Sequence, residues 1–530
     1  MSFLRAVAVT GGLFAAACSL LVQTKGVQCQ NDQDCLARGF DAGGTMVCLD
    51  SVCVGPGVGG PCTTNQECVV RAAGQPAICR KDKNTCAPLL SADCQNVYGD
   101  FKSDDAIVLG SILSIKGTNA SSGQAELNSA LLALDDFANT IVGLPGAADG
   151  KPRPLVMVEC DDSADTTIAQ RSATHLVTDI GVPAILGPDS SGLCTAVINN
   201  VTIPNKVLLV SPAATSATLT GISQYFWRTS PSDNIQAVPL RLSVGEIATA
   251  ASLSTIKLAI LYKNDSYGSG LFTAVSSALQ INGSPVGDPK NAGNFKPVQY
   301  AADGSDLSTA VAQVVGFQPN IIAIFGTNEG ISSGLDAIEQ TWPGGTTPPP
   351  RPYYLISDGG EVQELLDEIS KSGNVRTRVR GTVPGTNNSL FQAFSLKYSG
   401  KYGSFPNVFG QAGSYDSAYL LAYAIASLGS GATVDGTGIS NGMKKMVGGA
   451  AIDVGVGQMQ TAVNTLMGGS AIDINGSSGP LDFDVNAHEA PSDIDVWCVV
   501  IDGQGNPSFQ DSQRSYDSKT GQMVGTYKCP

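Results

Sequence analysis

The stretch from residue 106 to residue 137, AIVLGSILSIKGTNASSGQAELNSALLALDDF, constrains the fold of this chain more than any other. It begins with a short apolar run, Ala106 to Leu113, that is rich in β-branched residues, as is typical of a parallel strand covered on both faces. A polar loop follows, in which Ser121 and Gln124 match a helix capping box. The next apolar residues recur at helical spacing on one face: Leu127, Ala130, Leu131, Leu134 and Phe137. The stretch therefore predicts the strand and helix that open a βαβ unit.

The same pattern then repeats along the chain. Further short apolar runs are Leu155 to Cys160, Ala184 to Leu186 and Val207 to Ser211, and helical patterns follow the first two. Repeated βα units predict an α/β fold with a doubly wound parallel sheet, which binds ligands beyond the carboxyl ends of its strands. Three of the four loops expected there are dominated by Ser, Thr, Gly and Ala, and none has a glycine-rich phosphate fingerprint.

The cysteines mark a separate region, residues 19–103. Of fourteen in the chain, nine fall between Cys29 and Cys94, and the first eight form a pattern duplicated at an offset of about 33 residues: Cys29, Cys35, Cys48, Cys53, Cys62, Cys68, Cys79 and Cys86. Each copy predicts a small module held by two disulfides. Zinc would need close CxxC pairs, which the sequence lacks, so no metal is expected. We expect the modules to fold independently of the region after residue 103.

The first 18 residues resemble an export signal. They contain one basic residue, Arg5, then an apolar run and small residues leading to Cys18. Ala15-Ala16-Ala17-Cys18 is similar to a bacterial lipobox, which predicts lipidation of Cys18 and a place in the cell envelope. The alternative is an uncleaved anchor, because residues 6–22 are about the shortest stretch that spans a bilayer.

Charge and motif content exclude several functions. The net charge of −15 and the pI near 4.6 leave no basic patch for nucleic acid. The sequence has no GxSxG elbow, HExxH motif or Walker loop, and no cofactor is expected. Asp161, Asp162 and Asp165 suggest paired catalytic carboxylates or a metal site, but we interpret them as charging and capping the next helix.

Beyond Pro231 to Asn234 the βα pattern restarts, which indicates a second lobe. The run from Gly479 to Asp502 predicts a closing antiparallel hairpin around a polar turn. Residues 503–530 form a polar tail, whose Cys529 is a candidate disulfide partner for Cys498.

Seven segments between Asp104 and Asp502 together resemble one family. They are AIVLGSILSIKGTNASSGQ, ILGPDSSGL, LLVSPAATSATLT, YFWRTSPSDNIQA, LAILYKNDSYGSGLFTAV, GQAGSYDSAYLLAYAIA and GPLDFDVN. In this order they are similar to the type I periplasmic solute-binding proteins, specifically the branched-chain amino-acid receptors of ABC importers.

The resemblance implies two Rossmann-like lobes joined by three crossings, with the ligand in the cleft between them. Applied to residues 104–502, it divides them into a first lobe, about 104–231 and 380–478, and a second lobe, about 232–379 and 479–502.

The resemblance also implies the ligand-binding residues. Ser190, Ser191 and Gly192 occupy the family's first ligand loop, and Ala213, Ala214 and Thr215 its second. Tyr267 matches a cleft tyrosine, Asn328 stands where another cleft aromatic is common, and Asp358 lies near the acid that binds the ligand's ammonium group. The leucine-type receptors have a disulfide between two loops that correspond to Cys160 and Cys194, so the resemblance implies that pair.

The expected function is therefore that of a lipid-anchored solute-binding protein, without enzymatic activity, for an amino acid or similar polar solute and an ABC permease. One alternative is a cell-surface sensor or interaction protein that uses the cysteine modules to bind a protein. Another is a hydrolase with an unrecognised triad in the cleft. If Cys18 carries lipid, thirteen cysteines remain, so at least one is free or intermolecular.

Overall fold

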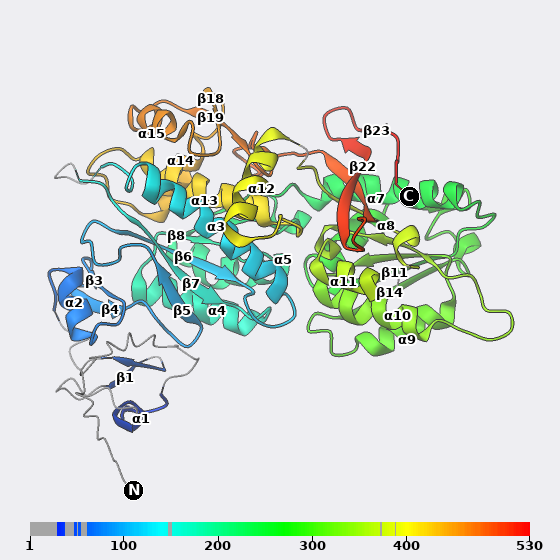
Figure 1. Ribbon diagram of the computed structural model, residues 1–530, viewed down its shortest axis with the longest axis horizontal. Helices are drawn as coiled ribbons and strands as arrows, with labels where there is room; N and C mark the ends of the chain where they lie inside the picture. Colours follow the sequence, from blue (N-terminus) through cyan, green and yellow to red (C-terminus); the bar gives the residue numbers. More distant parts are fainter. Residues whose placement is uncertain are drawn as a thin grey trace, which may run out of the picture.

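The computed structural model describes residues 29–37, 47–49, 51–54, 61–146, 151–371, 374–386 and 388–529. The expected export signal and Cys18 lie outside these residues. Two α/β lobes lie side by side, and the cysteine-rich region lies against the first of them (Figure 1). No helix in the described ranges is long and apolar enough to cross a membrane.

The first lobe is built on a six-stranded sheet in the order β10-β9-β8-β6-β7-β5. Its strands are β5 (Cys94–Tyr98), β6 (Ile107–Leu113), β7 (Leu155–Asp161), β8 (Ala184–Leu186), β9 (Leu208–Ser211) and β10 (Phe226–Arg228). All neighbours are parallel except β5, which runs antiparallel to β7. Apolar clusters cover both faces: Leu109 of β6 packs in one and Ile112 in the other. The expected doubly wound sheet is therefore present.

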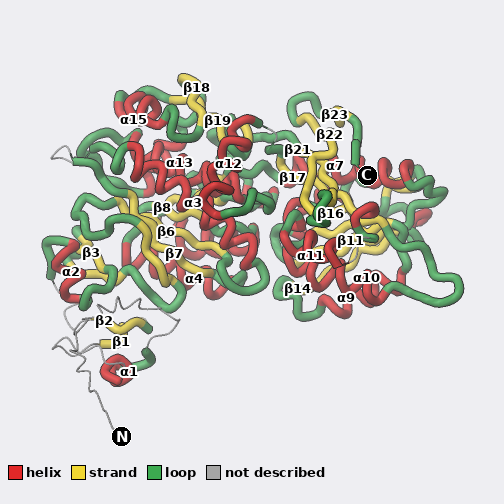
Figure 2. Tube along the Cα trace, in the orientation of Figure 1, coloured by secondary structure: helices red, strands yellow, loops and turns green. Residues whose placement is uncertain are grey.

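Helices lie on both sides of the sheet (Figure 2). One face packs against α3 (Ala120–Thr140), α12 (Ser389–Tyr402), α13 (Gln411–Ala426), α14 (Gly436–Met443) and α15 (Met459–Met467). The other face packs against α4 (Thr166–Thr174), η1 (His175–Ile180), α5 (Ser191–Val197) and η2 (Ile198–Thr202), with α6 (Ile203–Asn205) after them. Asp165 caps α4 by accepting from the N–H groups of Thr167 and Ile168, as expected. A small sheet of β18 (Ala450–Asp453), β19 (Ile472–Gly476) and β20 (Gly479–Pro480) lies beside α15.

The second lobe is built on an eight-stranded sheet in the order β14-β11-β15-β16-β17-β21-β22-β23. Its strands are β11 (Leu258–Asn264), β14 (Phe295–Ala301), β15 (Ile321–Phe325), β16 (Tyr353–Ile356), β17 (Val379–Pro384), β21 (Ile494–Ile501), β22 (Pro507–Asp517) and β23 (Gln522–Gly525). The first five strands in that order are parallel, and β21, β22 and β23 add antiparallel pairs.

Helices also cover both faces of this second sheet. One face packs against α7 (Asp233–Ala250) and α8 (Gly268–Ser276), and the other against α9 (Leu307–Phe317), η5 (Gly330–Leu335), α10 (Asp336–Thr341) and α11 (Gln363–Lys371). Minor elements of the two lobes are η3 (Ala217–Leu219), β12 (Gln280–Ile281), β13 (Ser284–Pro285), η4 (Pro289–Asn291), η6 (Asp358–Gly360) and η7 (Arg376–Arg378).

Three boundaries expected from the sequence differ from the structure. Strand β17 pairs with β16 in the second sheet, so the return to the first lobe comes after Pro384 and not at residue 380. The segment from Gly479 forms no hairpin with β21, because β20 pairs with β19 and β21 pairs with β17 and β22. Residues 503–530 are not merely a tail, since β22 and β23 extend the second sheet, and the disulfide Cys498–Cys529 fixes their end, as the sequence suggested.

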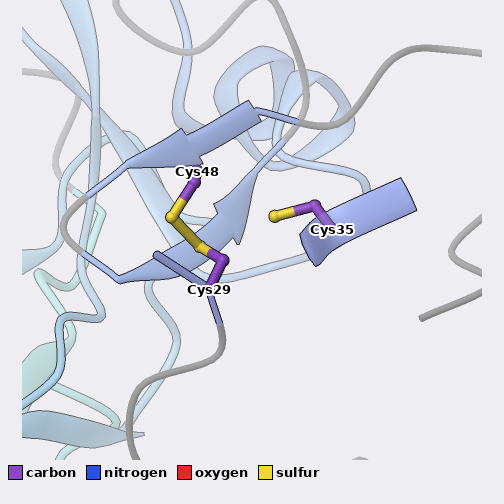
Figure 3. A group of neighbouring side chains, drawn as sticks. All are labelled: Cys29, Cys35 and Cys48. Carbon is purple, nitrogen blue, oxygen red and sulfur yellow. A yellow bond between two sulfur atoms is a disulfide. The ribbon is translucent and has the colours of Figure 1, made fainter. Parts of the chain in front are cut away.

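Each cysteine module contains two disulfides. The first has α1 (Asp32–Ala37), β1 (Val47–Leu49) and β2 (Val52–Val54), with the pairs Cys29–Cys48 and Cys35–Cys53. The second has α2 (Asn65–Arg71), β3 (Ala77–Arg80) and β4 (Thr85–Pro88), with Cys62–Cys79 and Cys68–Cys86. Figure 3 shows Cys29, Cys35 and Cys48 close together in the first module. Because these sulfurs form disulfides, they offer no thiolate to a metal ion.

The expected disulfide between Cys160 and Cys194 is wrong. Cys160 bonds to Cys94, and Cys194 is free and buried. The reason is β5, which pairs with β7 so that Cys94 lies directly opposite Cys160.

The same strand overturns the expected independence of the cysteine-rich region. Strand β5 completes the first lobe's sheet, and Ile78, Ala87 and Leu89 belong to that lobe's apolar cluster. The Arg80 guanidinium donates to the carbonyl of Thr178 at 2.6 Å. The second module is therefore packed into the first lobe.

Candidate ligand-binding site

A cavity lies between the lobes, where the loops at the carboxyl ends of both sheets meet. Its empty volume is about 530 Å³, open mouth included. The residues that line it are Asn119, Ser122, Glu126, Asp189, Ser190, Ser191, Ala213, Asp265, Tyr267, Thr327, Asn328, Asp358, Gly359, Glu361, Val362 and Phe409.

The structure brings most of the sequence-predicted site residues to this cavity. Six of the nine line it: Ser190, Ser191, Ala213, Tyr267, Asn328 and Asp358. Ala214 is buried and is not among the lining residues. Gly192 lies at the lobe interface, where a Cβ would come 3.3 Å from Asp265 Oδ2. Thr215 is buried but is not among the lining residues. Ligand contact by Thr215 therefore stays a prediction.

Tyr267 and Asp358 form a buried pair on the second lobe. The Tyr267 hydroxyl donates to Asp358 Oδ1 at 2.6 Å and accepts from the Gly359 N–H at 3.1 Å. A Cβ at Gly359 would come 2.6 Å from the carbonyl of Gly326, so glycine is required for this close approach. Burial raises the pKa of Asp358 to about 6 and that of Tyr267 above its usual range. The pair fixes a carboxyl group at the cavity wall.

Four further acids in the cavity were missed by the sequence analysis: Glu126, Asp189, Asp265 and Glu361. Glu126 was hidden inside the helical pattern of α3, and the others are single acids in loops after strands. Burial is the main cause that raises the pKa of each one, and for Glu361 the value is about 8. The position of Asp189 in ILGPDSSGL, directly beside the predicted serines, was the one available signal.

The two lobes touch beside the cavity through a polar clasp of Ser121, Asn328 and Glu364. The Ser121 hydroxyl donates to Glu364 Oε1 at 2.8 Å, and the Asn328 amide donates to Glu364 Oε2 and to Ser121 Oγ, both at 2.9 Å. Ser121 therefore contacts the other lobe and does not cap its own helix, whose N-cap Asn119 makes no side-chain capping bond. The Ser216 hydroxyl also donates to the Ser266 carbonyl at 2.8 Å. These hydrogen bonds join the two lobes beside the cavity.

Replacing Glu364 by alanine is expected to weaken binding of any solute enclosed in the cavity by about three- to tenfold. The change removes the acceptor of two hydrogen bonds, one of which joins the lobes, and each typically contributes about 0.5–1.5 kcal/mol. Titration calorimetry measures the effect. Asp367→Ala is the matched control, because Asp367 is exposed on the same helix, and equal affinities in the two variants would contradict a role for the clasp.

The fold places a cavity between two α/β lobes, an arrangement in which a protein can close around a small molecule. The chain belongs to the periplasmic binding protein family, whose model matches residues 106–460.

Known proteins share this architecture. The leucine-binding protein LivK of Thermotoga maritima superposes with a TM-score of 0.57 at 20% identity, covering 76% of this chain and 98% of that one. A solute-binding protein of an ABC transporter from Rhodopseudomonas palustris, solved with 4-hydroxybenzoate, gives a TM-score of 0.57 at 15% identity, with 80% and 97% covered.

Two curated relatives match in sequence. BasB, a chemotactic signal transduction system substrate-binding protein of Halobacterium salinarum, is 23% identical over 387 residues, which are 71% of this chain and 83% of that protein. An uncharacterised protein of Methanocaldococcus jannaschii is 22% identical over 290 residues, 53% of this chain, and the match spans 63% of that relative's length.

Proposed function

We propose that this protein is an extracytoplasmic solute-binding lipoprotein that closes around a small polar ligand and delivers it to an ABC importer. The observation that carries the proposal is the cavity, because loops of both lobes line it and only closure brings them together. Related structures are a leucine-binding protein and a solute-binding protein solved with 4-hydroxybenzoate, which supports a small solute here. The proposed activity is binding without covalent chemistry.

Membrane attachment is part of the proposal. Lipid on Cys18 would hold the chain at the envelope surface while the lobes remain in water. Intact-mass analysis of protein extracted from membranes tests this: the expected N-terminus is a lipid-modified Cys18. An unmodified chain that still begins at Met1 would support the alternative of an uncleaved anchor.

A second candidate is a sensor that passes ligand binding to a partner protein. Two observations favour it: the relative BasB is named for chemotactic signalling, and this chain carries two cysteine modules, the second of which is packed on its first lobe. A ligand-dependent complex with a permease in cross-linked membranes would favour transport. A ligand-dependent complex that forms through the modules would favour the sensor.

A thermal-shift screen of the full chain in detergent tests ligand binding. It compares amino acids, amides, short peptides, sugars, hydroxybenzoates and amines. A solute that binds only the folded state raises the free energy of unfolding, by about 2.7 kcal/mol when its concentration is a hundred times its dissociation constant. The melting midpoint rises as a result. No shift with any class would contradict the proposal.

Once a ligand is found, Asp358→Asn is expected to weaken its binding at least tenfold. Asp358 lines the cavity, is buried, and is held by Tyr267, so its carboxylate is positioned for a charge-assisted hydrogen bond. Loss of such a bond typically costs about 1.5–3 kcal/mol. The control is Asp303→Asn, an exposed acid outside the cavity, and unchanged affinity in both variants would place the ligand elsewhere.

A further inference from the structure

The wall of the interlobe cavity carries acids without cations. Five of its sixteen lining residues are carboxylic acids, and none of the sixteen is lysine, arginine or histidine. Glu126 and Asp189 come from the first lobe, and Asp265, Asp358 and Glu361 from the second. A ligand in this cavity therefore meets carboxyl groups on both sides.

Glu126 gives the clearest indication that the cavity binds a hydrogen-bond donor. Its side chain is 1% exposed, it lines the cavity, and its Oε2 has no hydrogen-bond partner. The backbone leaves room for it, since a Cβ at Gly410, where φ is +95°, would clash with Glu126 Oε1. A buried carboxyl oxygen without a partner is costly, so a donor from a ligand would be strongly favoured.

The neighbouring cations are already engaged. Lys263 is 3.1 Å from Glu329 Oε1 and donates to Thr327 Oγ1 at 3.0 Å. Arg228 is buried and donates to Glu489 and to the carbonyl of Ala214 in the second ligand loop. Neither residue lines the cavity, so a positive charge in contact with its acids would come from the ligand, and it would favour their ionised forms.

The loop that would receive a ligand carboxylate is blocked by an acid. Asp189 Oδ1 accepts the N–H of Ser190 at 2.6 Å, and Ser191 Oγ accepts the N–H of Ser216 at 3.1 Å. One backbone donor of this loop is thus already used, and a carboxylate placed there would lie beside that of Asp189. Two neighbouring carboxylates repel each other, so binding of an amino acid's carboxylate at this loop is disfavoured.

The arrangement does not suit a metal ion. In the described part of the chain, only two groups of cysteines bring three ligand atoms within 4.8 Å of one another, and the cavity acids form no such group. The carboxyls are instead separated, with the apolar side chains of Ala213, Val362 and Phe409 also lining the cavity. This pattern suits charged ends joined by a hydrocarbon stem.

We propose that the ligand is a diamine or polyamine, an organic cation with at least two amino groups and no carboxylate. It is bound between Glu126 and Asp189 on one lobe and Asp358 and Glu361 on the other. This inference rests on the proposed function and names the solute class of that same cavity. A dication bridging the two sets of acids favours the closed form, because closure brings both within its reach.

Titration calorimetry of the full chain with matched pairs of solutes tests the inference. Cadaverine and L-lysine differ only by the carboxylate, as do agmatine and L-arginine. The expected result is that each amine binds at least tenfold more tightly than its amino acid and that putrescine or spermidine also binds. Tighter binding of L-lysine than of cadaverine would overturn the inference.

Variants locate the site. Glu361→Gln and Glu126→Gln are each expected to weaken cadaverine binding at least tenfold, whereas the exposed Asp303→Asn leaves it unchanged. If Glu126→Gln lowers the melting midpoint, Glu361→Gln decides alone. Full affinity in Glu361→Gln would overturn the inference.

The remaining outcomes distinguish failure of the diamine inference from failure of the proposed function. Binding of L-leucine or 4-hydroxybenzoate without binding of any amine would overturn the diamine inference and leave the solute-binding function standing. Absence of binding by every class would overturn both.

Discussion

Replacing Arg228 by methionine is expected to lower the free energy of unfolding by about 3–5 kcal/mol, the usual result of removing one partner of a buried ion pair. Arg228 is fully buried at the end of β10 and donates to Glu489 Oε2 at 2.9 Å. It also donates to the carbonyls of Ala214 at 3.0 Å and Ser216 at 2.8 Å, which fixes the second ligand loop. The variant therefore leaves a carboxylate and two carbonyls without their donor.

Denaturation in urea measures this effect. The control is Arg514→Met, because Arg514 pairs with Glu246 where both side chains are more than a fifth exposed. An exposed pair contributes about 0–1 kcal/mol, so the control is expected to change little. The double variant Arg228→Met/Glu489→Gln should recover part of the loss, since it removes the orphaned charge. Equal stability of Arg228→Met and the wild type would contradict the structural role of the arginine.

Replacing both Cys94 and Cys160 by alanine is expected to cost about 4 kcal/mol in the chain-entropy view of disulfides. This disulfide closes a sequence separation of 66 residues and joins β5 to β7. Without it, β5 and the cysteine modules are held to the first lobe only by noncovalent contacts. The melting midpoint of the first lobe measures the loss.

Cys194→Ala is the matched control for that variant. Cys194 is buried but unbonded, so its replacement removes only packing and is expected to cost on the order of 1 kcal/mol. Peptide mapping without reduction gives the direct check. The expected product links the peptides of Cys94 and Cys160, and a product that links Cys160 to Cys194 would contradict this arrangement.

The central strands of both lobes were predictable because burial on two faces leaves a clear sequence pattern. Ala184–Leu186 and Tyr353–Ile356 are continuous apolar runs, and the structure places β8 and β16 there. Strands at the sheet edges lack that pattern. In β22, exposed and half-buried residues prevail, so the sequence read as a polar tail.

The disulfide partner of Cys160 was predicted wrongly for a related reason. Strand β5 is short and only partly buried, and its sequence, CQNVY, has no run that identifies a strand. Once β5 is unrecognised, Cys94 has no predicted neighbour, and a pairing by resemblance assigns Cys160 to Cys194. The added strand is a feature of this chain's cysteine-rich region, which lies outside the span that resembles the family.

The candidate site was predicted in position but not in charge. Ser190, Tyr267 and Asp358, which the resemblance implied as ligand-binding residues, line the cavity. The remaining acids come together only through folding, since Glu126 and Glu361 lie on different lobes and more than two hundred residues apart in sequence. No local sequence pattern predicts that residues so far apart in the chain lie in one cavity.

We propose that this protein encloses a small solute between its lobes. The most direct measurement is a crystal structure of the full chain with the solute that gives the largest melting shift. We expect density for that solute in the cavity, in contact with Asp358 of the second lobe and Asp189 of the first. An empty cavity, with the solute bound at the cysteine modules or on the outer face of one lobe, would contradict the claim.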